Sequence, residues 1–160
     1  SLADFGTGLI VDDRVQQARD SGALGVHLGR NDMPAAEARE LLGPDAIIGV
    51  TVNSLEEAIA ASRGPVDYLG AGPVFGTLSK DNPAPALGLD GLGRIVDAVA
   101  LPVVAIGGIN ADNAAAVIGQ GAYGVAVLSA VACAEDPEAA TRNIVEAVAG
   151  KAPGKVVHDD

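Results

Sequence analysis

The sequence predicts an α/β protein built on a parallel sheet. Six short apolar runs alternate with six segments of helical pattern along the chain. The apolar runs are hydrophobic along their whole length, as expected for strands that are covered on both faces. Polar residues gather where each run ends, and the opposite ends carry simple turn residues. Repeated strand–helix units of this kind are typical of a parallel sheet.

Length and composition favour one domain. The chain has 160 residues with 49% hydrophobic content, which is enough to bury a core. It has no Trp, two Tyr and two Phe, so the core is expected to consist of Ala, Val, Leu and Ile. We expect a single domain over residues 1–150. Residues 151–160 are polar, contain Pro and Gly, and are predicted to form a C-terminal tail.

The charge balance excludes several classes of partner. A net charge of −11 argues against binding to nucleic acid or to an anionic membrane, because no large basic face is available. No apolar run is long enough to cross a membrane, and Cys133 is the lone cysteine. These features predict a cytoplasmic protein that acts on small molecules, and a homo-oligomer is compatible with them.

The elements can be placed in order. The expected strands cover residues 9–11, 25–29, 46–50, 68–71, 103–106 and 124–128, and the expected helices cover 15–21, 34–42, 55–62, 89–99, 111–120 and 137–148. Gly22 ends the first helix and Pro34 opens the second. Ser54 and Glu57 form a capping box for the third. Asn110 is expected to cap the fifth helix, and Asp136-Pro137 opens the last.

The polar strand ends favour one type of parallel fold over another. Functional groups follow every expected strand: Asp12-Asp13, Arg30-Asn31-Asp32, Thr51 and Asn53, Thr77 to Lys80, Gly107-Gly108 with Asn110, and Ser129. A ring of such groups at the carboxyl ends of strands is typical of a TIM (β/α)8-barrel rather than an open doubly wound sheet. Because that barrel has eight strands, the prediction is a TIM barrel that lacks its first two strands, with six βα units present.

Two stretches are candidate anion sites. In residues 67–80 an apolar strand breaks at Gly72-Pro73 and leads to Thr77, Ser79 and Lys80, which could hold a phosphate; the alternative is a polar surface turn. Gly107-Gly108 and the loop at Ser129 follow neighbouring strands and could form a backbone phosphate cradle. The alternative for Gly107-Gly108 is a tight turn before a helix.

Carboxylates supply a candidate metal site. Asp13 and Asp32 end neighbouring strands and could bind Mg²⁺, which prefers one or two carboxylates plus substrate oxygens; the alternative is a pair of solvated aspartates. His27 lies within a strand and is expected to be a buried, hydrogen-bonded residue rather than a catalyst. Cys133 is expected to pack. No Ser-His-Asp or Cys-His set indicates a protein nucleophile.

The motifs together resemble the thiamine phosphate synthase family. The resemblance extends in unbroken order from about Leu9 to Val148 and rests on three motifs: HLG-x-x-D, GPVF-x-T-x-S-K and VAIGGI. It implies a TIM barrel and a transferase that joins hydroxymethylpyrimidine pyrophosphate to a thiazole phosphate. Mg²⁺ is required in that family, and pyrophosphate leaves first to give a pyrimidine carbocation. No protein nucleophile is needed for such a reaction.

The resemblance also implies roles for individual residues. Asp13 and Asp32 would be the Mg²⁺ ligands, and Lys80 and Thr51 the catalytic residues at the pyrophosphate. The thiazole phosphate would be held by Thr77, Ser79, Gly107, Gly108, Leu128 and Ser129. Asp12 stands where the family usually has Asn and adds a substrate-facing carboxylate beside the metal, and Arg30 replaces a usual Gln.

The family begins with two further strands and a Gln-x-Arg-x-Lys motif that reaches the pyrimidine pyrophosphate. Because neither is present here, we expect these residues to form no closed barrel and to have little synthase activity by themselves. Two other functions stay open at this point. One is a thiazole tautomerase-like enzyme, and the other is a non-catalytic phosphate-binding barrel.

Overall fold

The computed structural model describes residues 4, 6–76 and 84–149. These residues form one six-stranded sheet in which every neighbouring pair of strands is parallel. The strand order along the sheet equals the order along the chain, β1-β2-β3-β4-β5-β6. The predicted parallel α/β fold is therefore confirmed.

The elements have the following bounds. The strands are β1 Ile10–Asp12, β2 Gly25–Leu28, β3 Ile47–Val52, β4 Tyr68–Ala71, β5 Val103–Ile106 and β6 Gly124–Ala126. The helices are α1 Val15–Ser21, α2 Ala35–Leu42, α3 Leu55–Ala61, α4 Gly88–Ala98, α5 Ala114–Gly119, α6 Ser129–Ala132 and α7 Pro137–Val148. The predicted tail at 151–160 lies outside the described residues.

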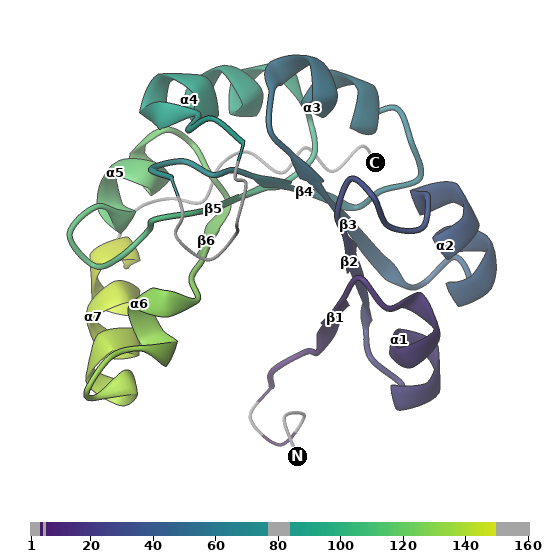
Figure 1. Cartoon of the computed structure of the whole chain (residues 1–160), viewed down its shortest axis with the longest axis horizontal. Coiled ribbons are helices and arrows are strands. Elements are labelled where there is room, and N and C mark those ends of the chain that lie inside the picture. Colours follow the sequence, from purple (N-terminus) through teal and green to yellow (C-terminus); the bar gives the residue numbers. More distant parts are fainter. Residues whose placement is uncertain (1–3, 5, 77–83, 150–160) are drawn as a thin grey trace.

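The sheet curls into a half-barrel, with the helices arranged along its convex side (Figure 1). β1 and β6 are its two edge strands and do not pair with each other. The described residues thus form six of the strands of a TIM-like fold without closing a barrel, as the sequence predicted.

The two faces of the sheet differ in what they bury. Side chains that point toward the helices are apolar and inaccessible to solvent: Val26, Leu28, Ile48, Val52 and Leu69 are all at most 2% exposed. The strand positions that alternate with them lie on the concave face. There His27, Thr51 and Tyr68 are half-buried and Ile106 is 41% exposed. The prediction that both faces are covered is therefore wrong for the described residues, because their helices cover the convex face.

Several helix ends follow the predicted signals. Gly22 ends α1 in the left-handed conformation, at φ 66°. The Ser54 side chain accepts a hydrogen bond from the backbone N–H of Glu57 and so caps α3. Asp136 caps α7 in the same manner by accepting from Ala139 N–H. Each cap satisfies an N–H that the first helical turn leaves unpaired.

Two predictions near the end of the sheet are corrected. The fifth helix begins at Ala114 rather than Ala111, because the Asn110 side chain accepts from Asp112 N–H and the Asn113 side chain accepts from Asn110 N–H. These local bonds hold a turn instead of a helix start. The last strand ends at Ala126 rather than residue 128, and the short helix α6, which was not predicted, begins at Ser129.

Candidate active site at the carboxyl edge of the sheet

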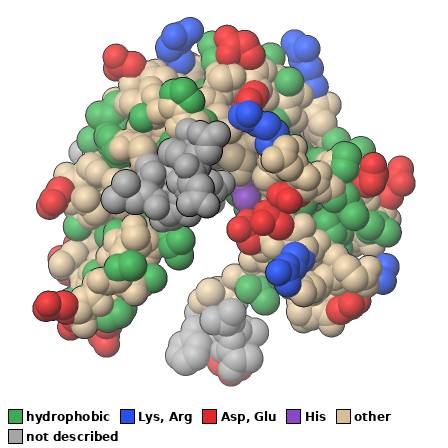
Figure 2. All heavy atoms as spheres, in the orientation of Figure 1, with side chains coloured by type: hydrophobic (Ala, Val, Ile, Leu, Met, Phe, Trp, Pro, Cys, Tyr) green, Lys and Arg blue, Asp and Glu red, His purple; other side chains and the backbone are tan. Residues whose placement is uncertain are grey.

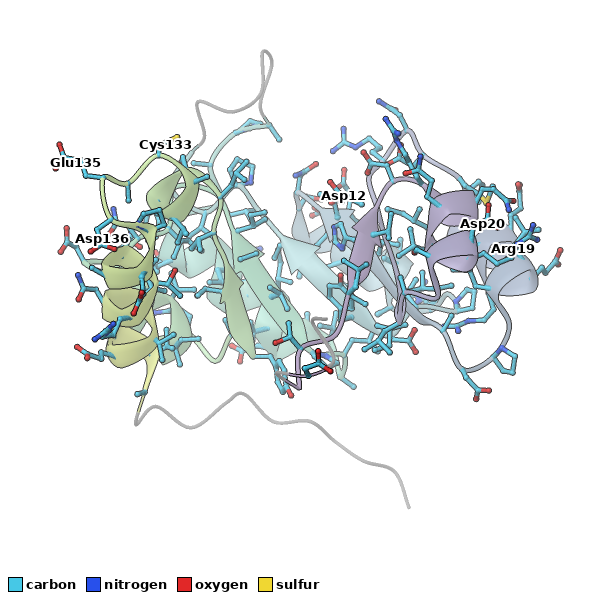
Figure 3. All side chains as sticks on the ribbon, turned by 90° about the horizontal axis from the view of Figure 1, so that it is seen from below. Asp12, Arg19, Asp20, Cys133, Glu135 and Asp136 are labelled. Atoms are coloured by element: carbon cyan, nitrogen blue, oxygen red, sulfur yellow. The ribbon has the colours of Figure 1, made fainter. Side chains whose placement is uncertain are left out.

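All six strands end at one edge of the sheet, and most of the predicted site residues lie there. Asp12 is the last residue of β1, and Figure 3 shows it at the edge from which the Cys133 loop also emerges. Asp13, Asp32, Gly107, Gly108, Leu128 and Ser129 follow the ends of their strands, and Thr51 is the second-last residue of β3. Thr77, Ser79 and Lys80 lie outside the described residues.

Asp13 has an unusual backbone conformation. Its φ of 63° is the one positive value of a non-glycine residue in the part of the chain that the structure describes. Its backbone N–H donates to the carbonyl of His27 at 2.8 Å, which ties the end of β1 to β2. Asp tolerates this left-handed region better than most residues do. The conformation turns the chain sharply at the position where a metal ligand was predicted.

Asp32 closes a tight turn after β2. Its Oδ2 atom accepts a hydrogen bond from Gly29 N–H at 2.6 Å. A Cβ on Gly29 would lie 2.8 Å from that same oxygen, so a larger residue there would displace the Asp32 carboxylate from this position. One carboxylate oxygen is thereby fixed. The Asp32 carboxylate thus has a defined orientation at the end of the strand that pairs with β1.

A hydrogen-bonded group that the sequence did not predict lies on the concave face. His27 Nδ1 is 2.9 Å from the Tyr68 hydroxyl, and His27 Nε2 is 2.9 Å from Thr51 Oγ1. The prediction that His27 is hydrogen-bonded holds, but the residue is half-buried and directly contacts a predicted catalytic residue. In Figure 2 a histidine surface is visible in the hollow of this face, near acidic side chains.

Burial raises the pKa of Tyr68, and the negative charge of Asp12 raises it further. Both effects disfavour a phenolate, because burial removes solvation from a charge and a nearby carboxylate repels it. Tyr68 is therefore a neutral hydroxyl at physiological pH. It can donate one hydrogen bond.

The Gly107-Gly108 turn is packed tightly against the segment that follows β4. Both glycines have positive φ, 97° and 67°. A Cβ on Gly107 would lie 2.6 Å from Pro73, and one on Gly108 would lie 2.9 Å from the Gly76 carbonyl and 3.0 Å from Phe75 Cβ. Phe75 N–H donates to the Gly107 carbonyl at 3.0 Å. Close backbone packing thus explains both glycines, whether or not a ligand also binds there.

A polar network connects the ends of β2, β3 and β4. Arg30 donates to Asn53 Oδ1 and to Glu57 Oε1, both at 2.7 Å. Glu57 Oε2 accepts from Asn53 N–H at 2.7 Å, and the Asn53 amide donates to the Gly72 carbonyl. The sequence signalled Glu57 as a helix-capping residue, but its bond to Arg30 joins segments distant in sequence and could not be foreseen.

Among the described residues no three His, Cys, Asp or Glu side chains cluster as a metal site. A metal held here by the protein would therefore use the two aspartates together with oxygens from substrate or water, which is the mode that Mg²⁺ favours.

No helix in the described residues is long and apolar enough to span a membrane.

The sequence profile of a family described as thiamine monophosphate synthase matches residues 2–131. The chain belongs to the thiamine monophosphate synthase family. The thiamine-phosphate synthase of Desulfitobacterium hafniense strain Y51 is 50% identical over 144 residues, covering 90% of this chain and 70% of that protein. The thiamine-phosphate synthase of Natronomonas pharaonis is 49% identical over 152 residues, covering 94% of this chain and 71% of that protein.

A solved structure of the thiamine monophosphate synthase type has the same fold. The thiamine phosphate pyrophosphorylase from Pyrococcus furiosus superposes with a TM-score of 0.84 at 49% identity. The match covers 93% of this chain and 72% of that one. The half-barrel therefore corresponds in fold to most of a thiamine phosphate pyrophosphorylase.

Proposed function

We propose that this protein is a thiamine-phosphate synthase, a transferase of thiamine biosynthesis that joins hydroxymethylpyrimidine pyrophosphate to a thiazole phosphate. The observation that carries the proposal is the match at about 50% identity to thiamine-phosphate synthases over nine-tenths of this chain. The geometry supports it, since the two aspartates, Thr51 and the paired glycines all lie at one edge of the sheet. TIM-barrel enzymes bind their substrates at this edge.

The reaction is a substitution at the methylene carbon of the pyrimidine. The bond from this carbon to the pyrophosphate oxygen breaks, and pyrophosphate leaves with the electron pair. The thiazole nitrogen then donates its lone pair to the same carbon. Departure is helped by groups that neutralise charge on the leaving oxygens. Lys80 supplies a cation for this purpose and Thr51 a hydroxyl.

Asp13 and Asp32 fit the hard oxygen ligands that Mg²⁺ prefers. They follow the ends of two paired strands, and the Gly29 N–H fixes the orientation of the Asp32 carboxylate. When bound, Mg²⁺ would neutralise charge on the departing pyrophosphate. Asp12 adds a third carboxylate next to Asp13 in the sequence and increases the negative charge at this end of the sheet edge.

The thiazole phosphate is assigned to the other half of the edge. Gly107 and Gly108 follow β5, and Leu128 and Ser129 follow its neighbour β6. Backbone N–H groups at such loops bind phosphate oxygens. Thr77 and Ser79 would add hydroxyl donors from the segment between β4 and α4.

Incubation of the full-length protein with both substrates and Mg²⁺ tests the proposal, with thiamine phosphate and pyrophosphate as the measured products. Equal amounts of the two are expected. If neither forms with the full-length protein, the synthase function is rejected, whereas the 160 residues alone are expected to give little of either product. Isomerisation of a thiazole phosphate without pyrophosphate release would indicate a tautomerase-like activity instead.

Replacement of Lys80 by Ala should lower kcat/KM at least about 10²-fold, the scale for losing one key electrostatic group. Lys155→Ala, which removes a lysine from the C-terminal segment, is the matched control and should leave the rate unchanged. An unaltered rate in the Lys80 variant would remove this residue from the mechanism.

A further inference from the structure

Three side chains on neighbouring strands form a continuous chain of hydrogen bonds on the concave face. Tyr68 of β4, His27 of β2 and Thr51 of β3 are joined through the two ring nitrogens of the histidine, with both contacts at 2.9 Å. The rings of His27 and Tyr68 also contact each other, with centroids 5.5 Å apart and planes tilted by 32°. Thr51 is therefore connected to Tyr68 through the imidazole.

Two glycines make room for the aromatic rings of this chain. A Cβ on Gly49 would overlap the Tyr68 ring, and a Cβ on Gly70 would lie 2.7 Å from His27 Cε1. The rings therefore lie over the backbone of the adjacent strands. Because the surrounding strands belong to the rigid sheet, the orientation of the imidazole is fixed by packing as well as by hydrogen bonds.

The direction of the hydrogen bonds decides which hydroxyl hydrogen of the group stays free for a ligand. In a neutral imidazole one nitrogen donates and the other accepts. If Tyr68 donates to Nδ1, then the ring proton resides on Nε2 and is donated to Thr51 Oγ1, which leaves the Thr51 hydrogen free. In the reverse direction Thr51 donates to Nε2 and the Nδ1 proton is donated to the Tyr68 oxygen, which leaves the Tyr68 hydrogen free. Each direction uses two of the three hydrogens of the group, and the first one leaves the Thr51 hydrogen for an anion, as the proposed role of Thr51 requires.

We infer that Tyr68 and His27 are positioning residues that hold the Thr51 hydroxyl as an acceptor, so that its own hydrogen points away from the histidine toward a bound anion. The raised pKa of Tyr68, caused first by burial and then by Asp12, agrees with its role as a donor. The inference rests on the proposed function, in which that anion is the leaving pyrophosphate. It adds two residues of the concave face to the machinery at the edge.

The first test is spectroscopic and needs no activity. The chain has two histidines, so ¹⁵N-labelled imidazoles give few signals, and a His158→Gln variant identifies the one from His27. We expect the neutral His27 ring to carry its proton on Nε2, and Tyr68→Phe to produce a mixture of the two neutral tautomers. A proton resident on Nδ1 in the unmodified protein would overturn the inference, and so would an unchanged tautomer in Tyr68→Phe.

The second test is a double-mutant cycle on kcat. Tyr68→Phe keeps the ring over Gly49 but removes the donor, and should lower kcat roughly 3- to 10-fold, the scale of one hydrogen bond. Thr51→Val removes the hydroxyl at similar volume and should cost at least about 10²-fold, whereas Thr51→Ser keeps the hydroxyl and should retain most of the rate. In the Thr51→Val background, Tyr68→Phe should change kcat by less than about twofold.

Independent effects in this cycle, with Tyr68→Phe costing as much in the Thr51→Val background as in the unmodified protein, would show that Tyr68 does not act through Thr51. KM for the thiazole phosphate should not change in Tyr68→Phe, because that substrate is assigned to the β5 and β6 loops. Tyr123→Phe, at an exposed tyrosine just before β6, is the control and should leave kcat unchanged. If the unmodified protein makes no thiamine phosphate, the proposed function fails while the tautomer measurement still decides the hydrogen-bond direction.

Discussion

Strands β1 to β3 and strands β5 and β6 end at the same edge of the sheet but offer different chemical groups. The first region presents side chains: the carboxylates of Asp12, Asp13 and Asp32, and the hydroxyl of Thr51. The second presents backbone, with Gly107 and Gly108 in positive-φ conformations. Side chains can neutralise a changing charge or hold a metal, whereas glycine turns give a static cradle. The two regions should therefore fail in different ways when mutated.

The largest effect is expected at Asp13. Asp13→Asn removes the charge while keeping a side chain that tolerates positive φ, so the fold should persist. The rate should fall at least about 10²-fold, because Mg²⁺, which would neutralise charge on the leaving pyrophosphate, would be held less tightly. Steady-state rates measured over a range of Mg²⁺ concentrations check this, with Asp20→Asn on the exposed surface of α1 as control. A rate within a few-fold of the unmodified protein would contradict a metal role for Asp13.

In the backbone region the expected effect is on stability as well as binding. Gly108→Ala forces an L-residue to φ 67° and places its Cβ 2.9 Å from the Gly76 carbonyl, so we expect a loss of roughly 2–4 kcal/mol in the free energy of unfolding. Gly22→Ala is the matched control. It has φ 66° and no atom within 4 Å of the added Cβ, so it should lose about 1–2 kcal/mol.

Urea unfolding of the two glycine variants separates crowding from backbone strain. Equal losses would show that the contact with residues 75–76 relaxes without cost. If a phosphate binds at this turn, Gly108→Ala should also raise KM for the thiazole phosphate, whereas Asp13→Asn should act mainly on the chemical step. A Gly108→Ala variant with unchanged KM would argue against the cradle.

A smaller effect is expected from the network that connects β2, β3 and β4. Glu57→Ala removes the bonds to Arg30 and to Asn53 N–H, and should cost about 1 kcal/mol in the free energy of unfolding. Glu138→Ala breaks an exposed pair with Arg142 and should cost about 0.3–0.5 kcal/mol. Thermal or urea unfolding compares them, and similar losses would mean that the network adds nothing beyond a surface ion pair.

The smallest effect concerns alkaline pH. The folded protein holds the Tyr68 proton more tightly than the unfolded chain does, because burial and Asp12 raise the pKa. The protonated Tyr68 hydroxyl therefore contributes fully to the free energy of unfolding below the ordinary tyrosine pKa of about 10. This contribution is lost as pH rises through the pKa that Tyr68 has in the folded protein. The free energy of unfolding should fall less steeply above pH 10 in Tyr68→Phe than in Tyr123→Phe. Identical pH dependence of the free energy of unfolding in the two variants would show that the pKa of Tyr68 is not raised by folding.

Periodicity and turn residues predicted the order of the elements and the edge that carries the site, because parallel strands must end together. They failed where local hydrogen bonds compete with helix formation, as at Asn110 and Asn113. They also missed the polar group of the concave face. A signal was present, because alternating positions of β2, β3 and β4 carry polar residues or glycine: His27, Gly49, Thr51, Tyr68 and Gly70. The glycines and the apolar residues between these positions made the strands resemble strands buried on both faces.

The order of strands along the sheet has a consequence for how the chain folds. Each strand pairs with the one before it in the chain, so most of the sheet can form by successive short loop closures. The exception is the step from β4 to β5, where Leu69 pairs with Val103 across the widest sequence separation in the sheet. Closing that loop adds an entropic cost that grows only slowly with its length. The pairing of β4 with β5 should therefore form somewhat later than the other strand pairs, and hydrogen exchange during refolding would detect the delay.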